Sequence, residues 1–199
     1  MGNVEPAKSL EVKLDKTLPN ITTTTSPPAN SQGWNNSDVT VTFTATDNLS
    51  GVASLTQPMT VNTEGANQHI GGEAIDLAGN RTTTYVILNI DKTPPAPSIT
   101  ATPNTLWPPN HKLVNVTISG GTTDNLSGIA SKVFHVEDEY NTVKPVISNF
   151  GSIIQLEAWR NGDDLGGRVY TISVTTKDKA DNQVTASTTV ICPHDQRKK

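Results

Sequence analysis

The clearest pattern in the chain is a strict alternation of apolar and polar residues over positions 39–46. Threonines separate the apolar members of this run, which are Val39, Val41, Phe43 and Ala45. Successive side chains of a β-strand point to opposite faces, so a period of two predicts a strand with one buried and one exposed face. The nearest approach to a helical period is the short segment Ile153–Arg160. The pattern therefore predicts an all-β protein.

Further short strands are predicted on either side of turns rich in Asp, Asn, Gly and Pro. They cover residues 53–56, 59–62, 68–75 and 81–90 in the first half of the chain, and 113–118, 132–137, 152–160, 167–177 and 184–191 in the second. Seven or so short strands in about 80–100 residues are typical of an immunoglobulin-like sandwich. We expect two such Greek-key β-sandwiches in series.

Three motifs recur in the same order, which divides the chain into two copies of one module. The pairs are 46–54 with 123–131 (offset 123 − 46 = 77), 14–19 with 90–95 (offset 90 − 14 = 76), and 76–80 with 178–182 (offset 178 − 76 = 102). In the first pair only Val52 and Ile129 differ. The second copy therefore carries roughly 25 additional residues (102 − 77) between its second and third motifs.

These repeats predict module one over 10–92 and module two over 96–195, with flexible ends at 1–9 and 196–199. Between the modules stand Pro94, Pro95 and Pro97. Proline fixes φ and lacks a backbone donor, so we expect no strand ladder to continue through this short, semi-rigid linker. The motif at 15–19 resembles the tail of a preceding module, which favours a longer repeat array.

Composition narrows the possible partners. The net charge is −4 and the only basic run is the tail 197–199, so we expect no nucleic-acid partner. No apolar run approaches the ~18 residues of a membrane helix, so we expect no membrane insertion. A single cysteine, Cys192, excludes an intrachain disulfide. The first residues lack the features of a signal peptide, so a secreted protein would contain this chain as a fragment.

The ordered motifs of module one resemble the bacterial Ig-like repeats of secreted and cell-surface proteins. They are 33–41, 46–51, 64–65, 76–80 and 91–95. Module two is similar to a C-terminal Ig-like module of large secreted bacterial proteins, through 106–112, 167–172 and 193–195. It departs from the usual hairpin in having Asp181 where glycine is expected, so this residue must accept any positive φ itself. The resemblance implies an extracellular or cell-surface, non-catalytic module joined to other domains of a parent chain.

We expect no enzyme activity. The histidines are His69, His111, His135 and His194, and none stands in a catalytic or metal-binding motif. Cys192 and His194 lie two residues apart, without a visible third ligand or orienting group. The alternative interpretation of this pair is a small hydrophobe that ends the last strand, followed by a solvated tail.

Calcium is the candidate cofactor, because hard cations bind several oxygen ligands. The candidate ligands lie in turn motifs and at the linker: Asp47, Asp76, Asp91, Asp124, Asp178 and Asp181. Asp15, the counterpart of Asp91, could also contribute, and the charge that Asp181 adds makes the Asp178/Asp181 loop the preferred site. The alternative is that these residues form Asx turns without metal, since Asp and Asn readily bond their own backbone.

Carbohydrate or a surface protein is the candidate ligand. We place such a site in the additional segment of module two, at Trp159, Arg160, Asp163 and Asp164, because insertions in sandwich loops often carry recognition. In a chain with so few aromatic residues, tryptophans are also needed to fill the cores. Two functions therefore stay open: a structural spacer in a surface or secreted protein, rigidified by calcium, and an accessory adhesion or carbohydrate-binding module attached to an enzyme. A sugar site requires a tryptophan ring open to solvent.

Overall fold

The computed structural model describes residues 4–142 and 145–194. Two compact units divide these residues: the first comprises 4–28, 38–63 and 67–88, and the second comprises 29–37, 64–66, 89–142 and 145–194. Residues 4–19 form no regular secondary structure. The rest of the expected flexible ends (1–3 and 196–199), the basic tail and residue 195 lie outside the described residues.

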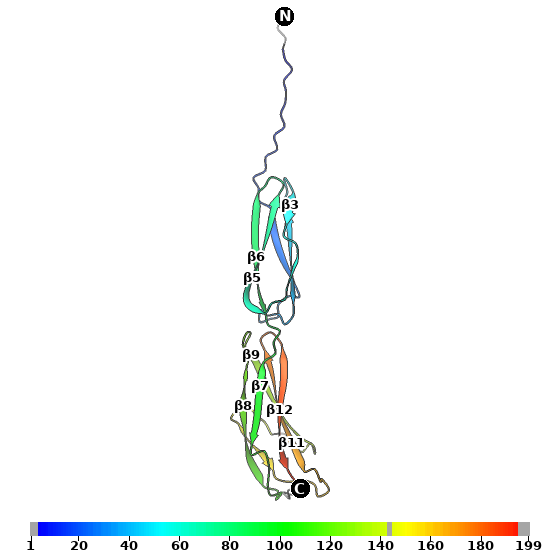
Figure 1. Ribbon diagram of the computed structural model, residues 1–199, viewed down its shortest axis with the longest axis vertical. Helices are drawn as coiled ribbons and strands as arrows, with labels where there is room; N and C mark the ends of the chain where they lie inside the picture. The colour runs from blue at the N-terminus through cyan, green and yellow to red at the C-terminus, as the bar shows by residue number, and fades with distance from the viewer. Residues whose placement is uncertain (1–3, 143–144, 195–199) are drawn as a thin grey trace. The chain divides into compact units, whose positions relative to one another are not determined.

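The first sandwich consists of strands β1 to β6 (Figure 1): β1 Asn20–Ser26, β2 Val39–Thr46, β3 Val52–Leu55, β4 Met59–Val61, β5 Gly65–Asp76 and β6 Arg81–Ile90. Its two sheets have the orders β1-β2-β4 and β3-β5-β6. The strands β1 and β4 both pair antiparallel with β2. The alternation along β2 is confirmed, since Val39, Val41 and Phe43 are buried and the threonines between them are not.

The second sandwich consists of strands β7 to β12: β7 Ala96–Thr102, β8 Leu113–Thr123, β9 Ile129–Asp138, β10 Ile153–Glu157, β11 Arg168–Asp178 and β12 Gln183–Cys192. Its sheets have the orders β10-β8-β7 and β12-β11-β9, so each strand has a counterpart in the first sandwich. The additional residues lie on both sides of β10, over 139–152 and 158–167. The core includes Leu106, Ile118, Leu156, Tyr170 and Ile172.

The prediction of two all-β sandwiches of the immunoglobulin type is confirmed. In each, the first, second and fourth strands form one sheet and the third, fifth and sixth form the other, as in an immunoglobulin fold that lacks one strand. The expectation of about seven strands is thus wrong by one for each sandwich within the described residues.

Two strands escaped the sequence analysis for identifiable reasons. Four of the seven residues of β1 are threonine, so this strand has almost no apolar alternation. The strand β7 contains Pro97, which the linker prediction placed outside any ladder. Proline is tolerated there because β7 lies at the edge of its sheet, where one side of the strand needs no donors. The predicted strand over 152–160 is shorter than expected and ends at Glu157.

Candidate metal centres

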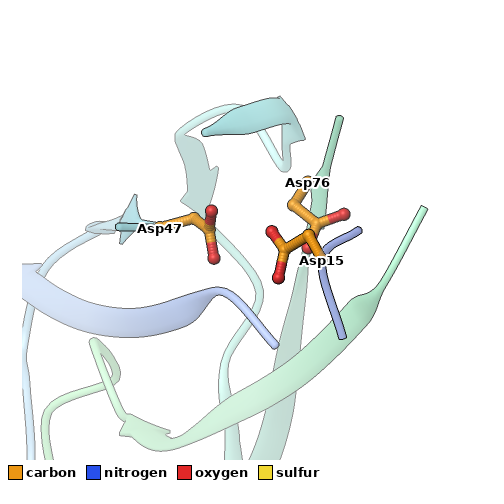
Figure 2. A group of neighbouring side chains, drawn as sticks. All are labelled: Asp15, Asp47 and Asp76. Atoms are coloured by element: carbon orange, nitrogen blue, oxygen red, sulfur yellow. The ribbon is translucent and has the colours of Figure 1, made fainter. Parts of the chain in front are cut away.

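Each sandwich gathers three aspartates at one end. The first cluster contains Asp15, Asp47 and Asp76, whose carboxylates converge from three separate segments of the chain (Figure 2). The second cluster contains the repeat counterparts Asp91, Asp124 and Asp178. In both clusters one oxygen from each residue lies within 4.8 Å of the other two.

The turn after the second strand of each sandwich fixes the first carboxylate. Oδ1 of Asp47 accepts hydrogen bonds from the backbone amides of Leu49 (3.1 Å) and Gly51 (2.8 Å). Asp124 accepts the same two bonds, from Leu126 at 3.2 Å and Gly128 at 2.5 Å. Both glycines adopt positive φ, +83° and +79°, a conformation that other residues rarely adopt. The motif therefore holds its carboxylate in place with local bonds alone.

The hairpin between the last two strands fixes the second carboxylate. Asp76 accepts hydrogen bonds from the backbone amide of Asn80 (2.8 Å) and from its side-chain amide (2.7 Å). Asp178 accepts the corresponding pair from Asn182, both at 2.8 Å. The same side-chain amides reach the entering chain, where Asn80 donates to the carbonyl of Thr17 (3.1 Å) and Asn182 to that of Asp91 (2.8 Å).

The third carboxylate comes from the segment that enters each sandwich. Asp15 accepts hydrogen bonds from the amides of Thr17 (2.8 Å) and Ser50 (3.0 Å). Asp91 accepts them from Thr93 (3.1 Å) and Ser127 (2.9 Å). Hydrogen bonds from Ser50 and Thr17 lower the pKa of Asp15 below its ordinary value of 3.8. These hydrogen bonds therefore favour the ionised form of Asp15 in the folded protein.

Hydrogen bonds leave part of this negative charge unmatched. Oδ2 of Asp47 is buried and receives no hydrogen bond from the described residues. In the second cluster the hydroxyl of Ser127 is also buried and has no partner in the part of the chain that the structure describes. Ser127 is 5 % exposed, and its amide donates to Asp91. Carboxylates at this spacing repel one another, and more strongly when they are partly removed from water. A cation between them would offset that repulsion.

The spacing of the oxygens fits calcium. Calcium binds oxygen ligands at about 2.3–2.6 Å, so ligands on opposite sides of the ion lie up to about 5 Å apart. The oxygens of each cluster lie within 4.8 Å of one another and can therefore share one such ion. Asp15, Asp47 and Asp76 would hold it in the first sandwich, and Asp91, Asp124 and Asp178 in the second.

Asp181, the other predicted ligand, does not belong to either cluster. Its carboxylate accepts hydrogen bonds from Lys177 at 2.5 Å and Asn30 at 2.7 Å, which lower its pKa. Its φ of 74° matches the expectation that it takes a glycine-like conformation, as its counterpart Gly79 does with a φ of 91°. The charge of Asp181 is therefore matched by a neighbouring lysine.

In the predicted ligand loop of the second sandwich, Arg160 and Asp164 form hydrogen bonds within the same sandwich. Arg160 donates to the carbonyls of Asn161 (2.8 Å) and His194 (3.0 Å). Asp164 accepts a hydrogen bond from the hydroxyl of Tyr140 and others from the amides of Gly166 and Gly167. Trp159 is half-buried, and Asp163 is exposed. Of the three tryptophans, only Trp107 is exposed, at 44 %.

A buried ion pair beside this loop had no signal in the sequence. The side chains of Arg168 and Asp138 are both fully buried and form a salt bridge. The Arg168 guanidinium lies over the rings of Tyr140 (5.1 Å), Trp159 (5.4 Å) and Tyr170 (4.6 Å). Burial opposes ionisation of Asp138, but hydrogen bonds from Arg168 and Thr142 outweigh it and lower its pKa.

The cysteine shows the properties of a structural residue. Cys192 is fully buried at the end of β12 and belongs to the core of the second sandwich. Burial raises the pKa of its thiol, which keeps the thiol protonated and unreactive.

Comparisons with known proteins find matches among solved structures. No family model matches the chain, and no curated protein matches it. Among solved structures it is similar to one described as "Structures of Clostridium thermocellum CbhA fibronectin(III)-like modules". The sequence identity is 16 % and the TM-score is 0.34, over 86 % of this chain and 94 % of the other. Within the described residues, no helix has the length and apolar character needed to cross a membrane.

Proposed function

We propose that this chain is a non-catalytic structural module of a larger secreted or cell-surface protein, and that each sandwich binds one calcium ion in its aspartate cluster. The resemblance of the repeats to bacterial Ig-like modules supports the extracellular setting. The observation that carries the proposal is the repetition of the cluster. Two copies of the module, with different loops elsewhere, keep the same three aspartates and the same set of backbone donors.

An ion at these positions would join three segments that are otherwise separate. In the first cluster these are the chain entering the sandwich, the turn after β2 and the end of β5. Folding must bring three negative charges together at this point, and calcium would turn that cost into a stabilising cross-link. This use of calcium suits a spacer, because it stiffens the place where the chain enters each module.

The proposal is tested by melting the full chain in EDTA and in millimolar calcium. An ion that binds only the folded state stabilises it by about 2.7 kcal/mol at 100 times its dissociation constant. The matched variant combines Asp47→Asn with Asp124→Asn, since asparagine keeps the Oδ1 acceptor that forms each turn. We expect calcium to raise the melting temperature of the natural chain and to leave that of the double variant unchanged.

A control substitution, Asp163→Asn, removes one exposed negative charge outside both clusters. This variant should respond to calcium as the natural chain does. Equal melting temperatures in EDTA and in calcium for the natural chain would refute the calcium sites.

The alternative function is an accessory module that binds carbohydrate or a surface protein. The observation in its favour is the exposed ring of Trp107, because a sugar site needs an aromatic face open to solvent. This alternative is tested by measuring tryptophan fluorescence while soluble glycans are added to the protein. It predicts a saturable change that Trp107→Ala abolishes, whereas the spacer function predicts no change.

A further inference from the structure

Apolar side chains surround the first cluster and are open to solvent. Leu14, Leu49 and Leu77 are 69 %, 66 % and 72 % exposed. They line a hollow of about 520 Å³, together with Asp15 and Ala78. Three large apolar residues exposed around one hollow are unusual for a surface that faces only water. We call this surface, formed by these five residues, the entry face of the first sandwich.

Most of the corresponding positions around the second cluster are less exposed, although Lys179, the counterpart of Leu77, is also exposed. Ile90, the counterpart of Leu14, is fully buried, and Leu126, the counterpart of Leu49, is 38 % exposed. Ala180 is 2 % exposed, whereas its counterpart Ala78 is exposed. The repeat thus provides two versions of the same surface, one more exposed in the first sandwich and one less exposed in the second.

Two segments contact the surroundings of the second cluster. Residues 29–37 and 64–66 belong to the same compact unit as the second cluster. From the first of these segments, Asn30 donates a hydrogen bond to the carbonyl of Lys179 at 2.8 Å. From the other, the carboxylate of Glu64 accepts hydrogen bonds from the amide of Lys92 (2.5 Å) and the hydroxyl of Thr93 (3.1 Å). The first segment is the loop between β1 and β2, whose Asn35 forms a bridge with Ile90 at the end of β6, and the second is the start of β5.

The segment before the first cluster has the pattern of such a last strand. Leu10, Val12 and Leu14 stand 76 positions before Val86, Leu88 and Ile90 (86 − 10 = 76), and the motif Asp-Lys-Thr follows both runs. In β6, Leu88 and Ile90 are 5 % and 0 % exposed, whereas their counterparts Val12 and Leu14 are 75 % and 69 % exposed. Residues 10–14 therefore have the apolar alternation of a strand but pair with no sheet within the described residues.

We propose that the entry face docks against another Ig-like sandwich of the same repeat type, which takes up Leu10–Leu14 as its last strand. Backbone hydrogen bonds to the neighbouring strand would provide the affinity, and the alternate apolar side chains would enter that sandwich's core. Segments of that sandwich equivalent to 29–37 and 64–66 would then cover Leu14 and Leu49. The proposal does not depend on calcium, since it follows from the apolar pattern and its exposure.

The test compares amide hydrogen exchange in the natural chain and in an extended chain. In the extended chain, residues 16–85 are repeated directly before Leu10, so that Leu10–Leu14 takes the place of Val86–Ile90 in the added copy. A matched control adds the complete segment 16–90, with its own last strand, and a flexible Gly/Ser linker before residue 1. All measurements are made in EDTA and in calcium, which separates this proposal from the calcium sites.

We expect the amides of residues 10–14 to exchange rapidly in the natural chain and in the control. In the extended chain they should exchange at least about 100-fold more slowly, as amides of a paired strand do. Equal rapid exchange in all three proteins would overturn the proposal. It would also be overturned if the added copy stayed unfolded in the extended chain but folded in the control.

Discussion

The two aspartate clusters share their hydrogen bonds but differ in their surroundings. Asp91 is fully buried, whereas its counterpart Asp15 is only partly buried. Yet the Asp–Gly turn, the Asp–Asn hairpin and the bond from serine to the entering aspartate have the same partners in both. The short motifs therefore orient each carboxylate in the same way in both copies. How deeply a cluster is buried depends on the segments around it.

The largest expected effect belongs to a feature of the second sandwich alone. Arg168→Leu leaves the buried carboxylate of Asp138 without its cation, and breaking a buried pair in this way costs about 3–5 kcal/mol. We expect urea denaturation to show the second sandwich unfolding at much lower urea, with the first unaffected. The double variant Arg168→Leu, Asp138→Leu should recover much of the loss.

The matched control for that variant is Arg81→Leu in the first sandwich. Arg81 binds Glu73 at 3.0 Å, and its side chain is 63 % exposed. An exposed pair of this kind contributes about 0–1 kcal/mol. A similar loss from both arginine substitutions would contradict the interpretation of the buried Arg168–Asp138 pair as the more stabilising of the two.

Single substitutions separate the two clusters. Asp47→Asn should remove the calcium-dependent stabilisation of the first sandwich, about 2.7 kcal/mol at 100 times the dissociation constant, and leave that of the second. Asp124→Asn should have the reverse effect. Calorimetry of each variant with and without calcium measures both. If either variant abolished both responses, the clusters would not be independent sites.

Acid should affect the first cluster through Asp15. Hydrogen bonds lower the pKa of this carboxyl in the folded state, so its contribution to stability is present above the ordinary value of 3.8 and is lost as pH falls through the lowered value. We expect the stability of the first sandwich in EDTA to fall across this window. Asp15→Asn should flatten that part of the profile, which urea titrations at a series of pH values would show. An unchanged slope would contradict this role.

The smallest effect is expected at the hairpin position where the two copies differ. Asp181→Gly relieves a positive φ but removes the bonds from Lys177 and Asn30, and these opposing effects are each about 1 kcal/mol or less. We expect the melting temperature of the second sandwich to change little, and its response to calcium to remain. Loss of the calcium response in this variant would restore Asp181 as a ligand.

The sequence was sufficient for the fold class and for most strands, because a buried face imposes its period on the residues of β2, β6 and β11. It was insufficient for β1. Threonine favours a strand conformation, but a run of threonines shows no alternation of apolar and polar residues that would reveal a buried face. The ion pair of Arg168 with Asp138 was also beyond reach. The two residues are 30 positions apart (168 − 138 = 30), and only the packed structure shows that they meet.

The aspartates of the clusters were identified individually, but not as groups. The sequence shows three repeated motifs, and each contributes one aspartate, so the triad was present as a pattern of offsets. What could not be deduced is that the turn, the hairpin and the entering segment meet at one end of each sandwich. That meeting depends on which strands are neighbours. The preference for the Asp178/Asp181 loop rested on the additional charge of Asp181, which pairs with Lys177 in the structure.

The bonds at Asp91 also determine how the chain would carry mechanical force. Its carboxylate is held by Ser127 and its carbonyl by Asn182, so the entering segment is tied to two different loops. A force applied to this segment would act on both hydrogen bonds at once. They would have to break together instead of one after the other. Resistance to extension would therefore begin at the aspartate that enters each sandwich, before any strand is sheared from its sheet.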